Sequence, residues 1–268
     1  MPTAELNGIR IGYDVRGSGP LVVLVMGLGS PGRVWQLHQV PALVAAGYRV
    51  ATFDNRGIGA SEPGPPGMTI DDMVADTAAL VEHLGGGPAA VVGTSLGARV
   101  VQELLLARPE LVSRAVVLAG HGRLDATQQA LSAGECALHD AGIALPPRYR
   151  AAVTALHNLS PRTRADAVAV RDWLDLFEMS DPAAGPGVRA QLALAEFEDR
   201  GPAYRAISVP TLVVGFADDQ MIPAHLSREL ADAIPGAEYA EVADCGHFGY
   251  LERPDEVNAL LVGFLGAR

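Results

Sequence analysis

The stretch Gly93-Thr94-Ser95-Leu96-Gly97 decides the fold, because it fits the pattern G-x-S-x-G between an apolar run at 89–92 and a stretch of helical spacing at 96–107. A chain that turns this sharply from a strand into a helix strains the backbone of the serine, and the flanking glycines remove side chains that would clash. The turn would hold Ser95 out at the carboxyl edge of a sheet. A serine before a helix can also be only an N-cap, so the other segments of the chain decide its role.

Apolar runs on both sides of this turn predict a parallel sheet. They lie at 21–26, 49–53, 89–92, 115–118 and 211–214, and a further strand is predicted at 238–242. Continuous apolar runs suit strands that are buried on both faces, and the helical spacing at 69–84 and 96–107 predicts repeated βαβ units. The chain begins differently, since residues 4–15 alternate around Asn7-Gly8, which is the signal of an antiparallel hairpin. The fold class is therefore α/β.

Residues 121–206 interrupt the alternation of strands and helices. They contain no strand-like run and several helical stretches separated by Pro and Gly. We expect one sheet domain formed by 1–120 and 207–268, with 121–206 as a helical insertion. One predicted helix of the insertion places four apolar side chains on a single face: Val170, Trp173, Leu174 and Phe177. Such a stripe packs on the rest of the protein or lines a ligand cavity.

The composition excludes several classes of protein. With 268 residues, 49% of them hydrophobic and 19% charged, the chain is globular and not disordered. The net charge of -11 and the lack of a basic run exclude nucleic acid as a partner. No stretch reaches the roughly 18 apolar residues that span a bilayer, and the chain lacks a secretory signal, so we expect a cytoplasmic protein that does not bind membranes. Cys136 and Cys245 have no metal-ligand spacing, and we expect both to be reduced.

A second glycine-rich motif competes with the first. The stretch Gly27-Leu28-Gly29-Ser30-Pro31-Gly32 matches G-x-G-x-x-G after a predicted strand, and Asp54 follows at the end of the next one. On its own this is the fingerprint of a dinucleotide site. Three features speak against it: a hairpin precedes the motif, Trp35 follows where close helix packing is required, and Asp54 opens a glycine-rich stretch typical of a structured turn. We therefore disfavour nucleotide binding.

Two further segments supply a candidate base and a candidate acid. His247 follows Gly246 in a loop after the last predicted strand, and Asp218 and Asp219 come just past the run at 211–214. A lone histidine is often part of a core, and adjacent loop aspartates are often solvated or capping groups, so we expect at most one of the two to be catalytic. The chain order Ser, Asp, His is one in which a nucleophile, acid and base are known to occur.

Together these segments resemble the α/β-hydrolase superfamily, in particular its small esterases, lactonases and cofactor-free haloperoxidases. The stretch 93–97 resembles its nucleophile elbow, 26–29 its oxyanion turn, 54–61 its second-strand signature, and Gly246-His247-Phe248 its catalytic histidine segment. The resemblance covers nearly the whole sequence. It implies an eight-stranded, mostly parallel sheet with antiparallel N-terminal strands, helices on both faces and a helical cap at 121–206.

The resemblance also implies a catalytic arrangement. Ser95 would be the nucleophile, His247 the base, and Asp219 the carboxylate that orients the imidazole. The backbone N–H groups of Leu28 and Leu96 would form the oxyanion hole. No metal or other cofactor is implied.

The sequence departs from the family pattern at two places. Met26 replaces the usual His of the oxyanion turn, a change that leaves the backbone donors in place. The family's acid follows P-T-L-V-x-x-G-x-x-D, and this pattern reaches Asp219 when counted from Pro210 but Asp218 when counted from Gly215. The spacing to Pro223 favours Asp219.

The sequence indicates only the general class of substrate. An apolar cap with scattered Arg, His and Pro suggests a small to medium hydrophobic ester, lactone or thioester. Trp173, Phe177 and His121 are the expected pocket residues. Two other functions stay open at this point, namely hydrolysis of a C–C bond in an acyl-carbonyl compound by the same triad, and a ligand receptor built on a hydrolase scaffold. The sequence does not specify an oligomeric state.

Overall fold

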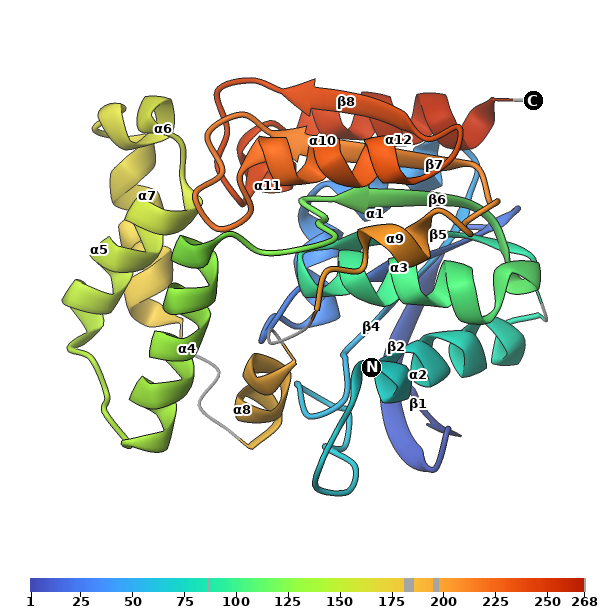
Figure 1. The fold of residues 1–268 in the computed structure, drawn as a ribbon, viewed down its shortest axis with the longest axis horizontal. Coiled ribbons are helices and arrows are strands. Elements are labelled where there is room, and N and C mark those ends of the chain that lie inside the picture. Colours follow the sequence, from blue (N-terminus) through green and yellow to red (C-terminus); the bar gives the residue numbers. More distant parts are fainter. Residues whose placement is uncertain (86, 181–185, 195–197, 268) are drawn as a thin grey trace.

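The computed structural model describes residues 1–85, 87–180, 186–194 and 198–267, and its centre is one sheet of eight strands (Figure 1). The spatial order of the strands is β1-β2-β4-β3-β5-β6-β7-β8. Their bounds are Thr3–Leu6 (β1), Ile9–Arg16 (β2), Leu21–Val25 (β3), Arg49–Phe53 (β4), Ala89–Thr94 (β5), Val112–Leu118 (β6), Thr211–Phe216 (β7) and Glu238–Val242 (β8).

The first two strands are antiparallel and the others form a parallel sheet. Strand β2 pairs antiparallel with both β1 and β4, while β4, β3, β5, β6, β7 and β8 run parallel to one another. Asn7 and Gly8 join β1 to β2 with φ of 47° and 76°, the left-handed pair of a type I′ turn. The predicted fold class, with its antiparallel N-terminal strands, is thus confirmed.

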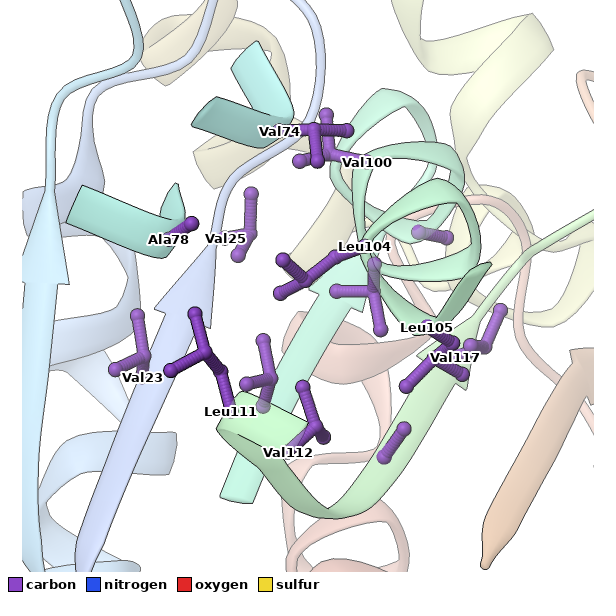
Figure 2. Close-up of a cluster of buried hydrophobic side chains, with 14 of the residues drawn as sticks. Val23, Val25, Val74, Ala78, Val100, Leu104, Leu105, Leu111, Val112 and Val117 are labelled. Carbon is purple, nitrogen blue, oxygen red and sulfur yellow. The ribbon is translucent and has the colours of Figure 1, made fainter. Parts of the chain in front are cut away.

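Helices cover both faces of the sheet, because alternate strand residues point to opposite sides. Val23 and Val25 of β3 are buried with helices α2 (Ile70–His83) and α3 (Leu96–Ala107), as Figure 2 shows. Val22 and Leu24 are buried with α1 (Gln39–Ala45) and α12 (Pro254–Gly266). Both faces of the central parallel strands are therefore buried, which explains their continuous apolar runs.

Helix α2 begins where its sequence specifies a cap. Thr69 accepts a hydrogen bond from the backbone N–H of Asp72, and the Asp72 carboxylate accepts one from the backbone N–H of Thr69. This reciprocal arrangement satisfies two donors that the first turn of a helix leaves unpaired.

The described part of the segment 121–206 is helical. Its helices are α4 (Ala126–Asp140), α5 (Pro147–Asn158), α6 (Pro161–Ala165), α7 (Ala169–Met179), α8 (Pro186–Ala193) and α9 (Gly201–Tyr204). Helices α4 to α7 lie together to one side of the sheet, on the left of Figure 1, and α8 lies between α4 and the sheet region. The remaining helices are α10 (Ala224–Ala233), α11 (Gly249–Glu252) and two short 3₁₀ helices, η1 (Gly32–Leu37) and η2 (Pro109–Leu111). Within the described ranges, the helices are too short or too polar for any of them to cross a bilayer.

A buried ion pair ties the turn after β4 to α2. The Arg56 guanidinium donates from Nε and Nη2 to the two carboxylate oxygens of Asp76, each at 2.6 Å. Both side chains are 2% exposed. A two-pronged pair of this kind fixes the position of the turn, and removal of either partner would leave the other buried without its main counter-ion.

The Asp76→Ala variant should therefore lower the free energy of unfolding by about 3 to 5 kcal/mol, because the buried Arg56 would lose its two-pronged partner and keep only the more distant carboxylate of Asp72, at 3.6 Å. Denaturant titration measures the change. The control is Glu110→Gln, which breaks the exposed pair between Arg108 and Glu110 and should have little effect. Equal stability of the two variants would contradict a structural role for the buried pair.

Candidate active site

Ser95 occupies a strained position between β5 and α3. Its backbone angles are φ 55° and ψ -119°, a left-handed φ that side chains other than glycine rarely adopt. The turn needs glycine on both sides, since a Cβ on Gly93 would collide with the backbone of Gly97, and a Cβ on Gly97 with the carbonyl of Val25. The G-x-S-x-G pattern thus has a direct steric cause.

His247 and Asp219 form a hydrogen-bonded pair at the carboxyl ends of the last two strands. Asp219 follows β7 and His247 lies between β8 and α11. The Nδ1 atom of His247 is 2.7 Å from Oδ2 of Asp219, and the two residues are 7% and 2% exposed. The other carboxylate oxygen accepts backbone N–H groups of Met221 and Ile222, each at 2.8 Å. The carboxylate is therefore fixed on three sides, and it orients the imidazole.

Asp218 is arranged differently from its neighbour. Its backbone N–H donates to the carbonyl of Cys245 at 3.0 Å, and its half-buried side chain has no hydrogen bond to any residue that the structure describes. Of the two aspartates, Asp219 is the one that contacts the imidazole.

Ser95 and His247 face the same cavity, whose volume is about 260 Å³. Three further residues expected from the sequence also line it, namely Leu28, Leu96 and His121. Leu96 opens α3, so its N–H belongs to the first turn, where N–H groups have no partner within the helix. The cavity thus brings together a serine, an oriented imidazole and the two predicted oxyanion positions.

Helices α4 and α8 complete the cavity wall with residues that the sequence did not single out. From α4 these are Gln128, Leu131, Ser132 and Glu135, and from α8 they include Gln191. The α4 residues follow the spacing i, i+3, i+4, i+7 and so share one face of the helix. That spacing was visible in the sequence, but nothing in the sequence showed that this face would turn toward Ser95.

Gln191 links α8 to the turn that contains Leu28. Its side-chain oxygen accepts the backbone N–H of Gly29 at 2.8 Å, and its side-chain nitrogen donates to the carbonyl of Arg56 at 3.2 Å. Gln191 is fully buried. A residue of the segment 121–206 therefore holds the turn in which an oxyanion donor is expected.

His121 lies directly after β6 and is buried at the cavity wall. Burial lowers the pKa of its imidazole to about 4, and the nearby charge of Arg99 acts in the same direction. The imidazole is consequently neutral at neutral pH.

Trp173 and Phe177 do not line the cavity, in contrast to the expectation that they would. Their rings lie 6.3 and 6.0 Å from the ring of Phe248, which does line it. Both side chains instead belong to a small apolar cluster with Ala151, Ala155 and Leu159. The apolar side chains of α7 thus pack against α5 and against Phe248.

The second glycine motif forms a structural turn. The carboxylate of Asp54 accepts the backbone N–H of Gly32 at 2.8 Å with one oxygen and that of Ala60 at 2.9 Å with the other. The motif leads into the short 3₁₀ helix η1 and not into an α-helix. The Asp54 carboxylate thus stabilises the backbone of this region, as expected for a structured turn. Among the residues that the structure describes, no group of three His, Cys, Asp or Glu side chains is placed to hold a metal ion.

The lowered pKa of His121 predicts a pH-dependent stability. The unfolded imidazole binds a proton below its ordinary pKa of 6.5, whereas the folded one stays neutral down to about 4. Protonation therefore favours the unfolded chain, and stability is lost as the pH falls from 6.5 toward 4. Between pH 7.5 and 4.5 this loss should amount to about 2 to 3 kcal/mol, and His121→Asn should remove it.

Denaturant titrations of the wild type and the variant at both pH values measure the difference. His157→Asn is the matched control, because His157 lies outside the cavity wall. The assignment fails if His121→Asn keeps the full pH dependence of the wild type.

Comparison with known proteins places this geometry in a family. A family model described as alpha/beta hydrolase fold matches residues 20–254. The chain is 49% identical to the Mycobacterium tuberculosis protein named "Putative non-heme bromoperoxidase BpoC", over 97% of this chain and 98% of that one. The crystal structure of that protein superposes with a TM-score of 0.92, covering 96% of this chain and 95% of the other.

Two other proteins to which this chain is similar carry the names of hydrolases. The chain is 31% identical to "Putative carbamate hydrolase RutD" of Azorhizobium caulinodans, over 99% of this chain and 98% of that one. It superposes with a TM-score of 0.85 on the enol-lactonase of Burkholderia xenovorans, with 25% identity and coverage of 99% and 100%. With its sheet order, its serine turn and these similarities, this chain belongs to the α/β-hydrolase family.

Proposed function

We propose that the protein is a serine hydrolase in which Ser95 is the nucleophile, His247 the general base and Asp219 the acid of the triad. One observation carries the proposal: Ser95, held in a strained turn, shares a cavity with an imidazole whose Nδ1 is bound to a buried carboxylate. This combination matches the roles that nucleophilic acyl transfer requires.

The proposed reaction proceeds through an acyl-enzyme. Ser95 Oγ attacks the carbonyl carbon of the substrate while the imidazole of His247 takes the hydroxyl proton at Nε2, and Asp219 stabilises the resulting imidazolium. The N–H groups of Leu28 and Leu96 donate to the oxyanion. His247 then gives the proton to the leaving group, and a water molecule, activated by the same imidazole, releases the acid.

The proposed substrate is a small to medium hydrophobic ester, lactone or thioester. The cavity of about 260 Å³ and the apolar side chains in its wall, among them Leu131, Leu192 and Phe248, support this class. The similarity to an enol-lactonase and to a carbamate hydrolase supports acyl chemistry at a carbonyl. We further propose that 1–120 and 207–268 form the catalytic core and that 121–206 is a cap, since α4 and α8 supply part of the wall.

A fluorophosphonate probe should label Ser95 covalently, because it reacts with a serine hydroxyl that a neighbouring base activates. Mass spectrometry of the labelled peptide locates the adduct. The Ser95→Ala variant should fold normally and take up no label, and a panel of acyl esters, lactones and thioesters should show no turnover with it. Labelling that persists in Ser95→Ala would contradict the proposed nucleophile.

The two adjacent aspartates should differ sharply in their effect on turnover. Asp219→Asn should lower kcat by roughly 10⁴-fold, since the amide would favour the wrong tautomer of His247. Asp218→Asn is the matched control and should change kcat little, because the Asp218 side chain has no hydrogen bond to the imidazole. The opposite ranking, measured with one ester substrate, would assign the acid to Asp218.

A further inference from the structure

One acidic side chain at the cavity wall has no part in the proposed reaction. Glu135 lies on the face of α4 that lines the cavity together with Ser95 and His247. Its carboxylate has no hydrogen bond or ion pair with any residue that the structure describes. The other carboxylate at the site, that of Asp219, is held by His247 and two backbone N–H groups.

The surroundings of Glu135 make this carboxylate unusual. Burial raises the pKa of the Glu135 carboxyl, and attraction to the charged form of His247 acts in the opposite direction. A half-buried carboxylate without a bonded partner disfavours folding at neutral pH. Its position is therefore a cost to stability that a ligand with the opposite charge would relieve.

Three other side chains that line the cavity can carry a positive charge, namely Arg99, His121 and His247. The guanidinium of Arg99 donates to the carbonyl of Leu194 and interacts electrostatically with Glu103. His121 is neutral at neutral pH because burial lowers its pKa to about 4. His247 is hydrogen-bonded to Asp219 through Nδ1.

We propose that Glu135 is a specificity-determining residue that selects substrates with a cationic group, a trimethylammonium or other alkylammonium, next to the acyl centre and disfavours anionic ones. The inference rests on the proposed hydrolysis at Ser95. Phe248 lines the same cavity, and aromatic rings attract alkylammonium groups. The rest of the wall is mainly apolar, which suits the methyl groups of such a cation.

The test compares esters that differ only in charge. Butanoylcholine and 3,3-dimethylbutyl butanoate form one pair, in which nitrogen is replaced by carbon in the alcohol. The p-nitrophenyl esters of 4-(trimethylammonio)butanoic acid and 5,5-dimethylhexanoic acid form the second pair, with the change in the acyl group. Mono-p-nitrophenyl glutarate supplies the anionic case.

In at least one pair, the wild type should show a kcat/KM about tenfold higher for the cationic ester, as expected for one partly solvated charge pair. Glu135→Gln should bring this ratio close to one. Glu135→Lys should reverse the preference toward the glutarate ester. The matched control is Asp175→Asn, which removes the same charge from an exposed position of α7 and should leave the ratio unchanged.

Two additional measurements separate this proposal from its alternatives. The melting temperature of Glu135→Gln should equal or exceed that of the wild type. If the carboxylate had a purely structural role, its removal would lower the melting temperature.

The second measurement is calorimetric binding of butanoylcholine and its neutral isostere to Ser95→Ala, which requires no turnover. If no ester is hydrolysed but the cation still binds more tightly in a manner that depends on Glu135, the hydrolase proposal fails and the charge selection stands. If the ratio of kcat/KM for the cationic ester to that for the neutral ester is the same in the wild type and in Glu135→Gln, the proposed charge selection is overturned and the proposed hydrolysis is unaffected.

Discussion

The turn between β5 and α3 allows one residue, Ser95, to adopt a left-handed backbone, and the rest of the site is built around this constraint. Strain of this kind costs about 1 to 3 kcal/mol and persists only where the surroundings leave no alternative. Here the surroundings are the backbone of Gly97 against Gly93 and the carbonyl of Val25 against Gly97. The serine is therefore placed by close backbone contacts at the carboxyl ends of β3 and β5.

The sheet can hold that strain because it is buried on both faces. Alternate residues of β3 contribute to two separate apolar clusters, one beneath α2 and α3 and the other beneath α1 and α12. At the carboxyl edge of this rigid layer, three loops bring Ser95, Asp219 and His247 to one place. The loop after β7 also fixes Asp219 by two backbone N–H groups, so the imidazole is oriented before any substrate arrives.

The helical segment 121–206 contributes contacts of another kind. Gln191 holds the N–H of Gly29 beside the predicted oxyanion donor of Leu28, and α4 brings Glu135 to the cavity. These helices are less buried than the sheet, and α4 has no buried residue. Their sequence can therefore vary with less effect on the core, which suits a segment that we propose to determine substrate choice while the sheet supplies the chemistry.

The sequence alone determined the fold class and the sharp turn at Ser95, because both depend on local patterns: apolar runs for strands buried on two faces, and glycines where a Cβ has no room. It also identified His247 and a pair of aspartates, but spacing alone left Asp218 and Asp219 close rivals. Only the tertiary structure showed which carboxylate contacts the imidazole, since that contact joins two loops that follow different strands. The cavity wall likewise depended on tertiary structure. The stripe with Trp173 and Phe177 was predicted to line the cavity but packs against Phe248, whereas α4 contributes Glu135 to the cavity wall. The reason is that the direction of a helix face is set by packing between distant segments and not by the periodicity of the helix itself.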